Sequence, residues 1–123
     1  MMKLIPNLLE RKISFMVIGS YSKLWNKIGK TYPRDLDIWV EPTPKTIDYF
    51  KEEYGIVLTP ERIGKIVNGT IKINIFLDVT GLQFTETLER ANEKLLSDKS
   101  SIKYLCKNDY IQNIKSTNKK WDF

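Results

Sequence analysis

The sequence predicts an α+β fold in which a mixed β-sheet is flanked by helices. Two observations predict it. An apolar run of strand length, Ile13 to Ile18, leads through a small-residue turn into a helical pattern, and Asn68-Gly69 separates two alternating segments as in a β-hairpin. The 123 residues, of which 41% are hydrophobic, suit a single domain over residues 1–123 with one ordinary core.

The N-terminal half is predicted to alternate helices and strands. The spacing of apolar residues indicates a short helix over 4–12, a strand over 13–18, a helix from Tyr21 to Lys30, a strand from Asp35 to Val40 and a helix from Thr46 to Tyr54. Gly19 and Ser20 form the turn after the first strand. Such a turn points free backbone N–H groups at the space above the strand.

The C-terminal half begins with the predicted hairpin. Its strands run from Arg62 to Val67 and from Thr70 to Val79, and further elements are a helix from Phe84 to Leu96, a short edge strand from Ile102 to Leu105 and a helix from Lys107 to Lys119 capped by Asn108. In the second hairpin strand, odd positions 71 to 79 share an apolar face. Lys72, Asn74, Phe76 and Asp78 share the other face, which is therefore available for chemistry.

Composition excludes several functional classes. The longest uncharged apolar run, Ile13 to Tyr21, is shorter than the roughly 20 residues that span a bilayer, so we expect a cytoplasmic protein with no membrane partner. One cysteine and no histidine exclude an internal disulfide, the usual zinc ligand sets and a Ser-His-Asp triad. Catalysis would depend on carboxylates, hydroxyls, amines or a metal held by oxygen.

The charge distribution hints at an anionic ligand. Lys and Arg number 20 against 15 Asp and Glu, which gives a net charge of +5, and the basic residues gather at both ends of the chain while the middle is acidic. A basic balance suits nucleic-acid or phosphate partners. It is equally typical of a solvated lysine-rich face.

The candidate site combines a small-residue turn with paired acids. Because side chains alternate along a strand, Asp35 and Asp37 lie on one face, where they offer the hard oxygen ligands that magnesium prefers. Gly19 and Ser20 would supply amide donors and a hydroxyl to a phosphate. Each feature also has a structural explanation, since acids often mark a solvated strand face, Gly-Ser pairs often only turn the chain, and Asp78 can cap the turn that follows it.

Three segments of the chain resemble a known family. The stretches 15–20 (Phe-Met-Val-Ile-Gly-Ser), 33–40 (Pro-Arg-Asp-Leu-Asp-Ile-Trp-Val) and 73–84 resemble the nucleotidyltransferase fold of the polymerase-beta superfamily, in particular its small single-domain members. The stretches 80–90 and 109–115 are more weakly similar to small relatives that include abortive-infection toxins. The resemblance implies a magnesium-dependent transfer of a nucleoside monophosphate from a nucleoside triphosphate to an acceptor hydroxyl on a protein, nucleic acid or small molecule.

The resemblance also implies roles for individual residues. Gly19 and Ser20 would bind the triphosphate, and Asp35 and Asp37 would hold the metal ions. A third carboxylate would activate the acceptor hydroxyl, and Lys115 would contact the phosphates. Such two-metal catalysis depends mainly on positioning and on neutralising charge.

The third carboxylate is the point at which the sequence departs from the family. Alignment on Gly81 and Phe84 puts Asn74, a candidate metal ligand, where related proteins tend to have Asp. Asp78 lies on the same predicted face four residues later, about 13 Å along the strand. An Asn offers a carbonyl oxygen to a metal but cannot act as a base, so Asp78 is the predicted catalytic residue, and Asn74 is the alternative occupant of the third position.

Alternative functions follow from the same features. The chain leaves little room for the helical domain with which many nucleotidyltransferases bind the acceptor, so a homodimer or a partner chain would complete the cleft. Trp25, Trp39 and Trp121 are candidates for such an interface, although core packing also explains the first two. One alternative is a catalytically degenerate nucleotidyltransferase-like binding protein, as in a toxin-antitoxin or phage-defence pair. Another is a small basic nucleic-acid binder.

Overall fold

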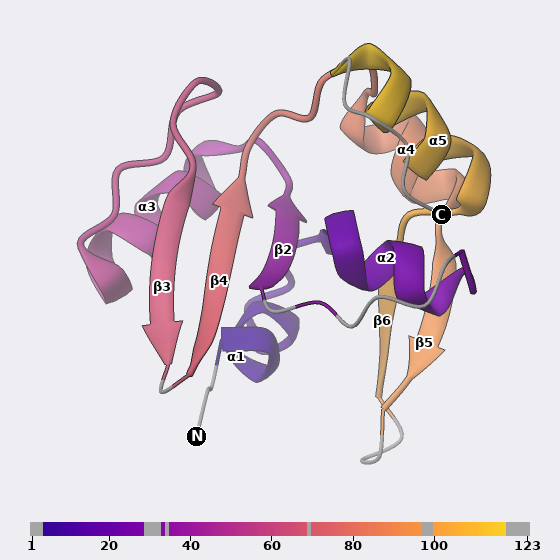
Figure 1. Cartoon of the computed structure of the whole chain (residues 1–123). Coiled ribbons are helices and arrows are strands. Elements are labelled where there is room, and N and C mark those ends of the chain that lie inside the picture. The colour runs from indigo at the N-terminus through magenta and orange to yellow at the C-terminus, as the bar shows by residue number, and fades with distance from the viewer. Residues whose placement is uncertain (1–3, 29–32, 34, 69, 97–99, 118–123) are drawn as a thin grey trace.

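The computed structural model describes residues 4–28, 33, 35–68, 70–96 and 100–117. Within these ranges it confirms an α+β fold of five helices and a six-stranded mixed sheet (Figure 1). The helices are α1 (Leu4–Glu10), α2 (Gly19–Trp25), α3 (Pro44–Tyr54), α4 (Phe84–Arg90) and α5 (Lys107–Ser116). The strands are β1 (Phe15–Ile18), β2 (Asp35–Val40), β3 (Gly64–Asn68), β4 (Ile71–Phe76), β5 (Asn92–Leu95) and β6 (Ser101–Tyr104).

The order of the sheet is β3-β4-β2-β1-β6-β5. The predicted hairpin forms the antiparallel edge pair β3–β4, and β2 and β1 are also antiparallel. Strand β2 runs parallel to β4, and β1 runs parallel to β6. As a result, the N-terminal end of β2 lies between the C-terminal end of β1 and the N-terminal half of β4.

Two hydrophobic clusters occupy the two sides of the sheet. In the first, leucines of α1 and aromatic residues of α3 pack on alternate residues of β2 and β4; its buried members include Leu4, Leu8, Tyr49, Phe50, Ile38, Val40, Ile73 and Ile75. In the second, Trp39 packs edge-on against Phe84 of α4 and its indole N–H donates to the Leu77 carbonyl at 3.2 Å. The strand alternation predicted for β2 therefore separates the two cores.

The helix α3 shows how local sequence defines an element. Thr43 accepts a hydrogen bond from the Thr46 backbone N–H, and Pro44 occupies the first turn, where its missing N–H costs nothing. Gly55 ends the helix with a φ of 66°. The helix predicted from Thr46 to Tyr54 is confirmed, and it begins two residues earlier because proline favours that position.

The predicted long helix over 84–96 is wrong. Helix α4 ends at Arg90, Ala91 is extended, and the next residues form the edge strand β5, which pairs antiparallel with β6. The strand predicted over 102–105 is therefore an interior strand and not an edge, in keeping with an Ile102 side chain that is 4% exposed. Hydrogen bonding to a neighbouring strand overrides the local helical spacing here.

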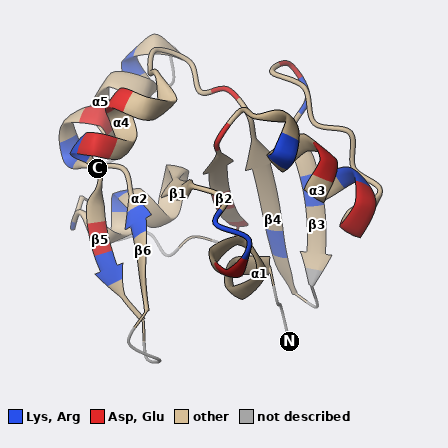
Figure 2. Cartoon of the chain, turned by 180° about the vertical axis from the view of Figure 1, so that it is seen from behind, with Lys and Arg blue, Asp and Glu red and all other residues tan. Residues whose placement is uncertain are grey.

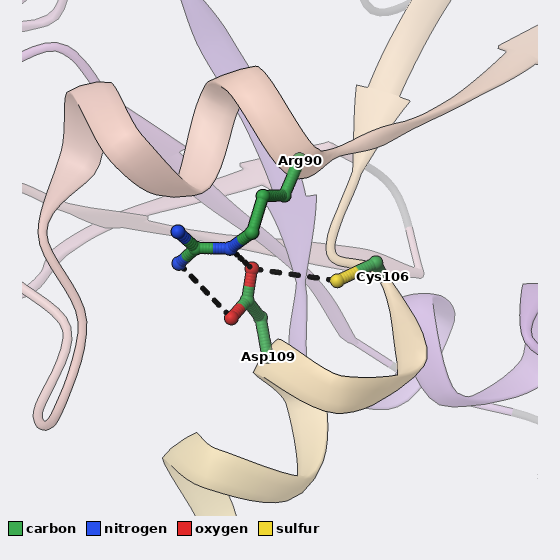
Figure 3. Close-up of polar contacts among 3 residues, drawn as sticks. All are labelled: Arg90, Cys106 and Asp109. Atoms are coloured by element: carbon green, nitrogen blue, oxygen red, sulfur yellow. Dashed lines mark hydrogen bonds and ion pairs between the residues drawn. The ribbon is translucent and has the colours of Figure 1, made fainter.

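The start of α5 also differs from the prediction. Cys106, not Asn108, occupies the N-cap position. Asp109 in the first turn accepts two hydrogen bonds from the Arg90 guanidinium, at 2.9 and 3.1 Å, and its Oδ2 lies 3.4 Å from Cys106 Sγ (Figure 3). This nearly buried carboxylate ties the end of α4 to the start of α5.

The helix predicted from Tyr21 to Lys30 is shorter than expected. Helix α2 begins at Gly19, so the predicted turn residues Gly19 and Ser20 are its first two residues, and it ends at Trp25. Lys27 takes a left-handed φ of 60° that breaks the helical path. Asn26 then donates to the Leu105 carbonyl at 2.7 Å, which anchors this end of α2 beside the end of β6. Trp25 packs edge-on against Tyr104, and the third tryptophan of the prediction, Trp121, lies outside the described residues.

The hairpin differs from the prediction at its turn. Asn68 pairs with Ile71, so the turn falls one residue later than the sequence suggested, and Gly69 lies outside the described residues. In consequence Lys65 lies opposite Asn74 and Val67 opposite Lys72. Strand β4 ends at Phe76, which places Val79 in the second cluster and not with Ile73 and Ile75.

The helices of the described ranges are all too short or too polar to cross a membrane. Charged residues are spread over most elements, with acidic residues on α3, α4 and α5 and basic residues on β3, β4, β5 and β6 (Figure 2). Within the described ranges both signs of charge therefore occur on several elements.

Candidate functional site

The paired acids of β2 lie beside an amide on β4. Because β2 and β4 are parallel, Asp37 is aligned with Asn74. The Asn74 side-chain nitrogen donates to Asp37 Oδ1 at 2.8 Å and lies 3.5 Å from Asp35 Oδ2. All three side chains are half-buried. The structure therefore brings Asp35, Asp37 and Asn74 together on one face of the sheet.

The Gly-Ser bend adjoins this cluster. Ile18, the last residue of β1, pairs with Asp37 on β2, and the chain turns immediately afterwards into α2. Gly19 has a φ of +64°, and a Cβ atom at this position would overlap Asp37 Oδ2. Only glycine combines this left-handed conformation with so close an approach. Ser20 follows with an exposed side chain.

The donor atoms suit a hard cation. Two carboxylates approach the same amide nitrogen, so two like charges are held close together at this point of the sheet. Magnesium prefers oxygen ligands from one or two carboxylates, completed by substrate phosphates and water. Rotation of the Asn74 amide would present its oxygen in place of its nitrogen, and the three side chains then fit magnesium.

The third polar side chain of the cluster is an amide and not a carboxylate. Among the residues that the structure describes, no group of three or more His, Cys, Asp or Glu side chains is placed to hold a metal ion. Asp35 and Asp37 therefore need Asn74, or ligands brought by a substrate, to complete a metal site. Two carboxylates and one amide form a weaker site than three carboxylates, because one negative charge is missing.

Asp78 does not join the cluster. It lies two residues beyond the end of β4 with an exposed side chain. It is four residues past Asn74 in the sequence, and the register of β4 with β2 ends at Phe76, before Asp78 is reached. The two candidates for the third position are thus spatially separate, and the neighbour of Asp35 and Asp37 is Asn74.

Lys115 lies on the last turns of α5. This end of the helix packs against the turn after β4: Asn113 donates to the Thr80 carbonyl at 3.0 Å, and a Cβ atom on Gly81 would overlap the Ser116 side chain. The weaker resemblance over 80–90 and 109–115 thus concerns segments that touch one another. A contact between Lys115 and phosphates stays a prediction.

Sequence reasoning missed one residue of this face. Lys65 on β3 lies opposite Asn74, and both Lys65 and Lys72 are exposed. Lys72, already predicted to share a face with Asn74, is aligned with Asp35 across the β2–β4 pair. The alternation of β3 alone could not place Lys65, because the position of the hairpin turn determines its partner.

Comparisons with known family models, curated proteins and solved structures give no match for this chain. The similarity of three segments to nucleotidyltransferases stays a prediction. The functional interpretation depends on the geometry around Asp35, Asp37, Asn74 and Gly19.

Proposed function

We propose that this protein is a magnesium-dependent nucleotidyltransferase, which binds a nucleoside triphosphate and moves its nucleoside monophosphate to an acceptor hydroxyl. The observation that carries the proposal is the contact between the Gly19 bend and the Asp37 carboxylate. It sets a backbone turn suited to phosphates against a pair of acids suited to magnesium. If Asp35 and Asp37 only marked a solvated strand face, position 19 would not need a glycine against the Asp37 carboxylate.

Each residue of the cluster has a distinct task in this proposal. Asp35 and Asp37 provide the carboxylates that hold the cation, and the Gly19–Ser20 bend offers backbone N–H groups and a hydroxyl to the phosphates. Asn74 orients Asp37 through its 2.8 Å hydrogen bond. When bound, magnesium would neutralise negative charge on the attacking and leaving oxygens.

The transfer step balances without a protein base. The acceptor hydroxyl oxygen forms a bond to the α-phosphorus, the bond from that phosphorus to the bridging oxygen breaks, and pyrophosphate leaves. The hydroxyl proton passes to solvent, because the Asn74 amide cannot accept it and Asp78 lies beyond the end of β4, outside the cluster. General-base catalysis is typically worth 10²–10⁴-fold, so we expect slow transfer.

Asn74 also favours a second candidate, a nucleotide-binding protein of the same fold that has lost transfer. An amide in the third position donates a hydrogen bond to Asp37 or, after rotation, offers a ligand oxygen to a cation, but in neither orientation can it act as a base. Such a protein would bind magnesium and triphosphate as one half of a toxin-antitoxin or defence pair. Its affinity for nucleotide would be retained without turnover.

Two measurements separate these candidates. Calorimetry with each nucleoside triphosphate, with and without magnesium, tests binding; incubation with α-labelled triphosphates and cell extract tests transfer. Magnesium-dependent binding with label transferred to an acceptor supports the enzyme. Binding with no transfer supports the second candidate, and the absence of binding in magnesium overturns both.

A further inference from the structure

Two exposed lysines flank the acidic cluster on the same face of the sheet. Lys72 is aligned with Asp35, and Lys65 lies opposite Asn74 on the edge strand β3. Directly paired strand residues share a face, so the lysine side chains project from the side that carries Asp35 and Asp37. In the described ranges neither lysine takes part in an ion pair.

This part of the sheet has no helix packed on it in the described chain. The helices α1 and α3 pack on the opposite face of β2 and β4, and Figure 1 shows β3 and β4 turned toward the viewer with α3 behind them. Val67, which lies opposite Lys72, is 68% exposed. The face thus presents two unpaired cations and an apolar side chain beside two acids.

The order of the strands separates the two sides of the proposed reaction. The Gly19–Ser20 bend follows β1 on one side of Asp35 and Asp37, whereas the lysines lie on β4 and β3 on the other side. In an in-line displacement, attacking and leaving oxygens lie on opposite sides of the phosphorus. With the triphosphate at the bend, the lysines lie on the side from which the acceptor approaches.

We infer that the acceptor is a nucleic-acid strand, whose phosphates contact Lys65 and Lys72 while its terminal hydroxyl faces the acids. This inference rests on the proposed function. Diagonal neighbours across two strands lie about 7–8 Å apart at Cα, so the two lysines can contact separate phosphates of one strand. The two lysines favour a polyanion by charge complementarity. Exposed Val67 offers apolar surface on which a nucleobase can pack, and an acidic peptide has no nucleobase.

The test measures binding of a short single-stranded RNA with a free 3′-hydroxyl over a series of salt concentrations. Each phosphate contact on a single strand contributes about 0.7 to the slope of log affinity against log salt, so Lys65→Ala with Lys72→Ala should lower the slope by about 1.4. Calorimetry with magnesium and triphosphate, run on the same variant, should give an unchanged affinity. The matched control is Lys45→Ala with Lys51→Ala, which removes the same charge from α3 on the opposite face.

The outcomes distinguish this inference from the proposed function. Equal weakening of RNA binding in both double variants, or unchanged binding in the Lys65 and Lys72 variant, overturns the inference. Loss of triphosphate affinity in that variant also overturns it, because the lysines would then contact the donor. If the wild-type chain binds RNA through these lysines but binds no triphosphate, the nucleic-acid surface is supported and the nucleotidyltransferase proposal fails. Circular dichroism of each variant controls for folding.

Discussion

The side-chain amide of Asn74 donates a 2.8 Å hydrogen bond to Asp37, so a neutral side chain contacts the paired acids from the neighbouring strand. An amide in this position both satisfies Asp37 and avoids placing a third negative charge beside Asp35. The arrangement stabilises the cluster in the absence of a cation. It also withholds the base on which fast transfer would depend.

Asn74→Asp should exchange stability for metal affinity. Without magnesium the new carboxylate removes the donor to Asp37 and adds a like charge, so we expect a loss of about 1–2 kcal/mol in the free energy of unfolding. Magnesium should reverse the loss, and transfer of label should rise. Urea unfolding in chelator and in magnesium measures the effect. If the free energy of unfolding of the variant is the same in chelator and in magnesium, position 74 does not face a cation.

Asp78→Asn should leave magnesium-dependent nucleotide binding and transfer unchanged. Asp78 is exposed and lies two residues beyond the end of β4, outside the contacts that join Asn74 to Asp35 and Asp37, so we expect it not to reach the reacting hydroxyl. The labelled-triphosphate assay checks this. Loss of transfer would show that Asp78 is the base, as its position on the predicted polar face of the strand suggested.

Gly19→Ala should damage the site more than the fold. The left-handed φ costs an alanine about 1–2 kcal/mol, and its Cβ would also displace the Asp37 carboxylate. Gly55→Ala is the matched control, since Gly55 has a φ of +66° with no atom near its Cβ position. Both variants should lose similar stability in urea, but only Gly19→Ala should lose nucleotide binding. Equal nucleotide affinity in the two variants would show that the Gly19 bend does not take part in nucleotide binding.

Tyr54 should contribute to the loss of stability at alkaline pH. Burial raises its pKa to about 12, with smaller contributions from Tyr49 and Glu53. Because the folded state favours the neutral phenol, this stabilisation is complete below the ordinary pKa of 10.0 and is lost as the pH rises toward 12. Tyr54→Phe should therefore lose less stability than the wild type between about pH 10 and about pH 12 in urea unfolding. Parallel loss in both proteins would contradict the role of Tyr54.

The sequence predicted the parts of the fold that local patterns control. The apolar run of β1, the alternation of β2 and the capped helix α3 are all confirmed, as is the shared face of Asp35 and Asp37. These features depend on side-chain periodicity and on residues with special backbone preferences. Both are visible in a single sequence.

Features that depend on distant strands could not be predicted in this way. Residues 92–95 have helical spacing but form β5, because β6 offers a hydrogen-bonding edge to them. The same holds for the site: alignment of Asp37 with Asn74 requires β2 and β4 to be parallel neighbours, and no local pattern specifies that pairing. The choice between Asn74 and Asp78 was open for this reason.

The most direct test of the account is a calorimetric titration of the wild-type protein and of Asp35→Ala with Asp37→Ala, using a nucleoside triphosphate with magnesium and then with chelator. Removal of two neighbouring carboxylates should leave the fold intact, as circular dichroism would show. The account predicts saturable binding by the wild type only when magnesium is present, and none by the double variant. Equal binding by both proteins, or binding that does not respond to magnesium, would contradict it.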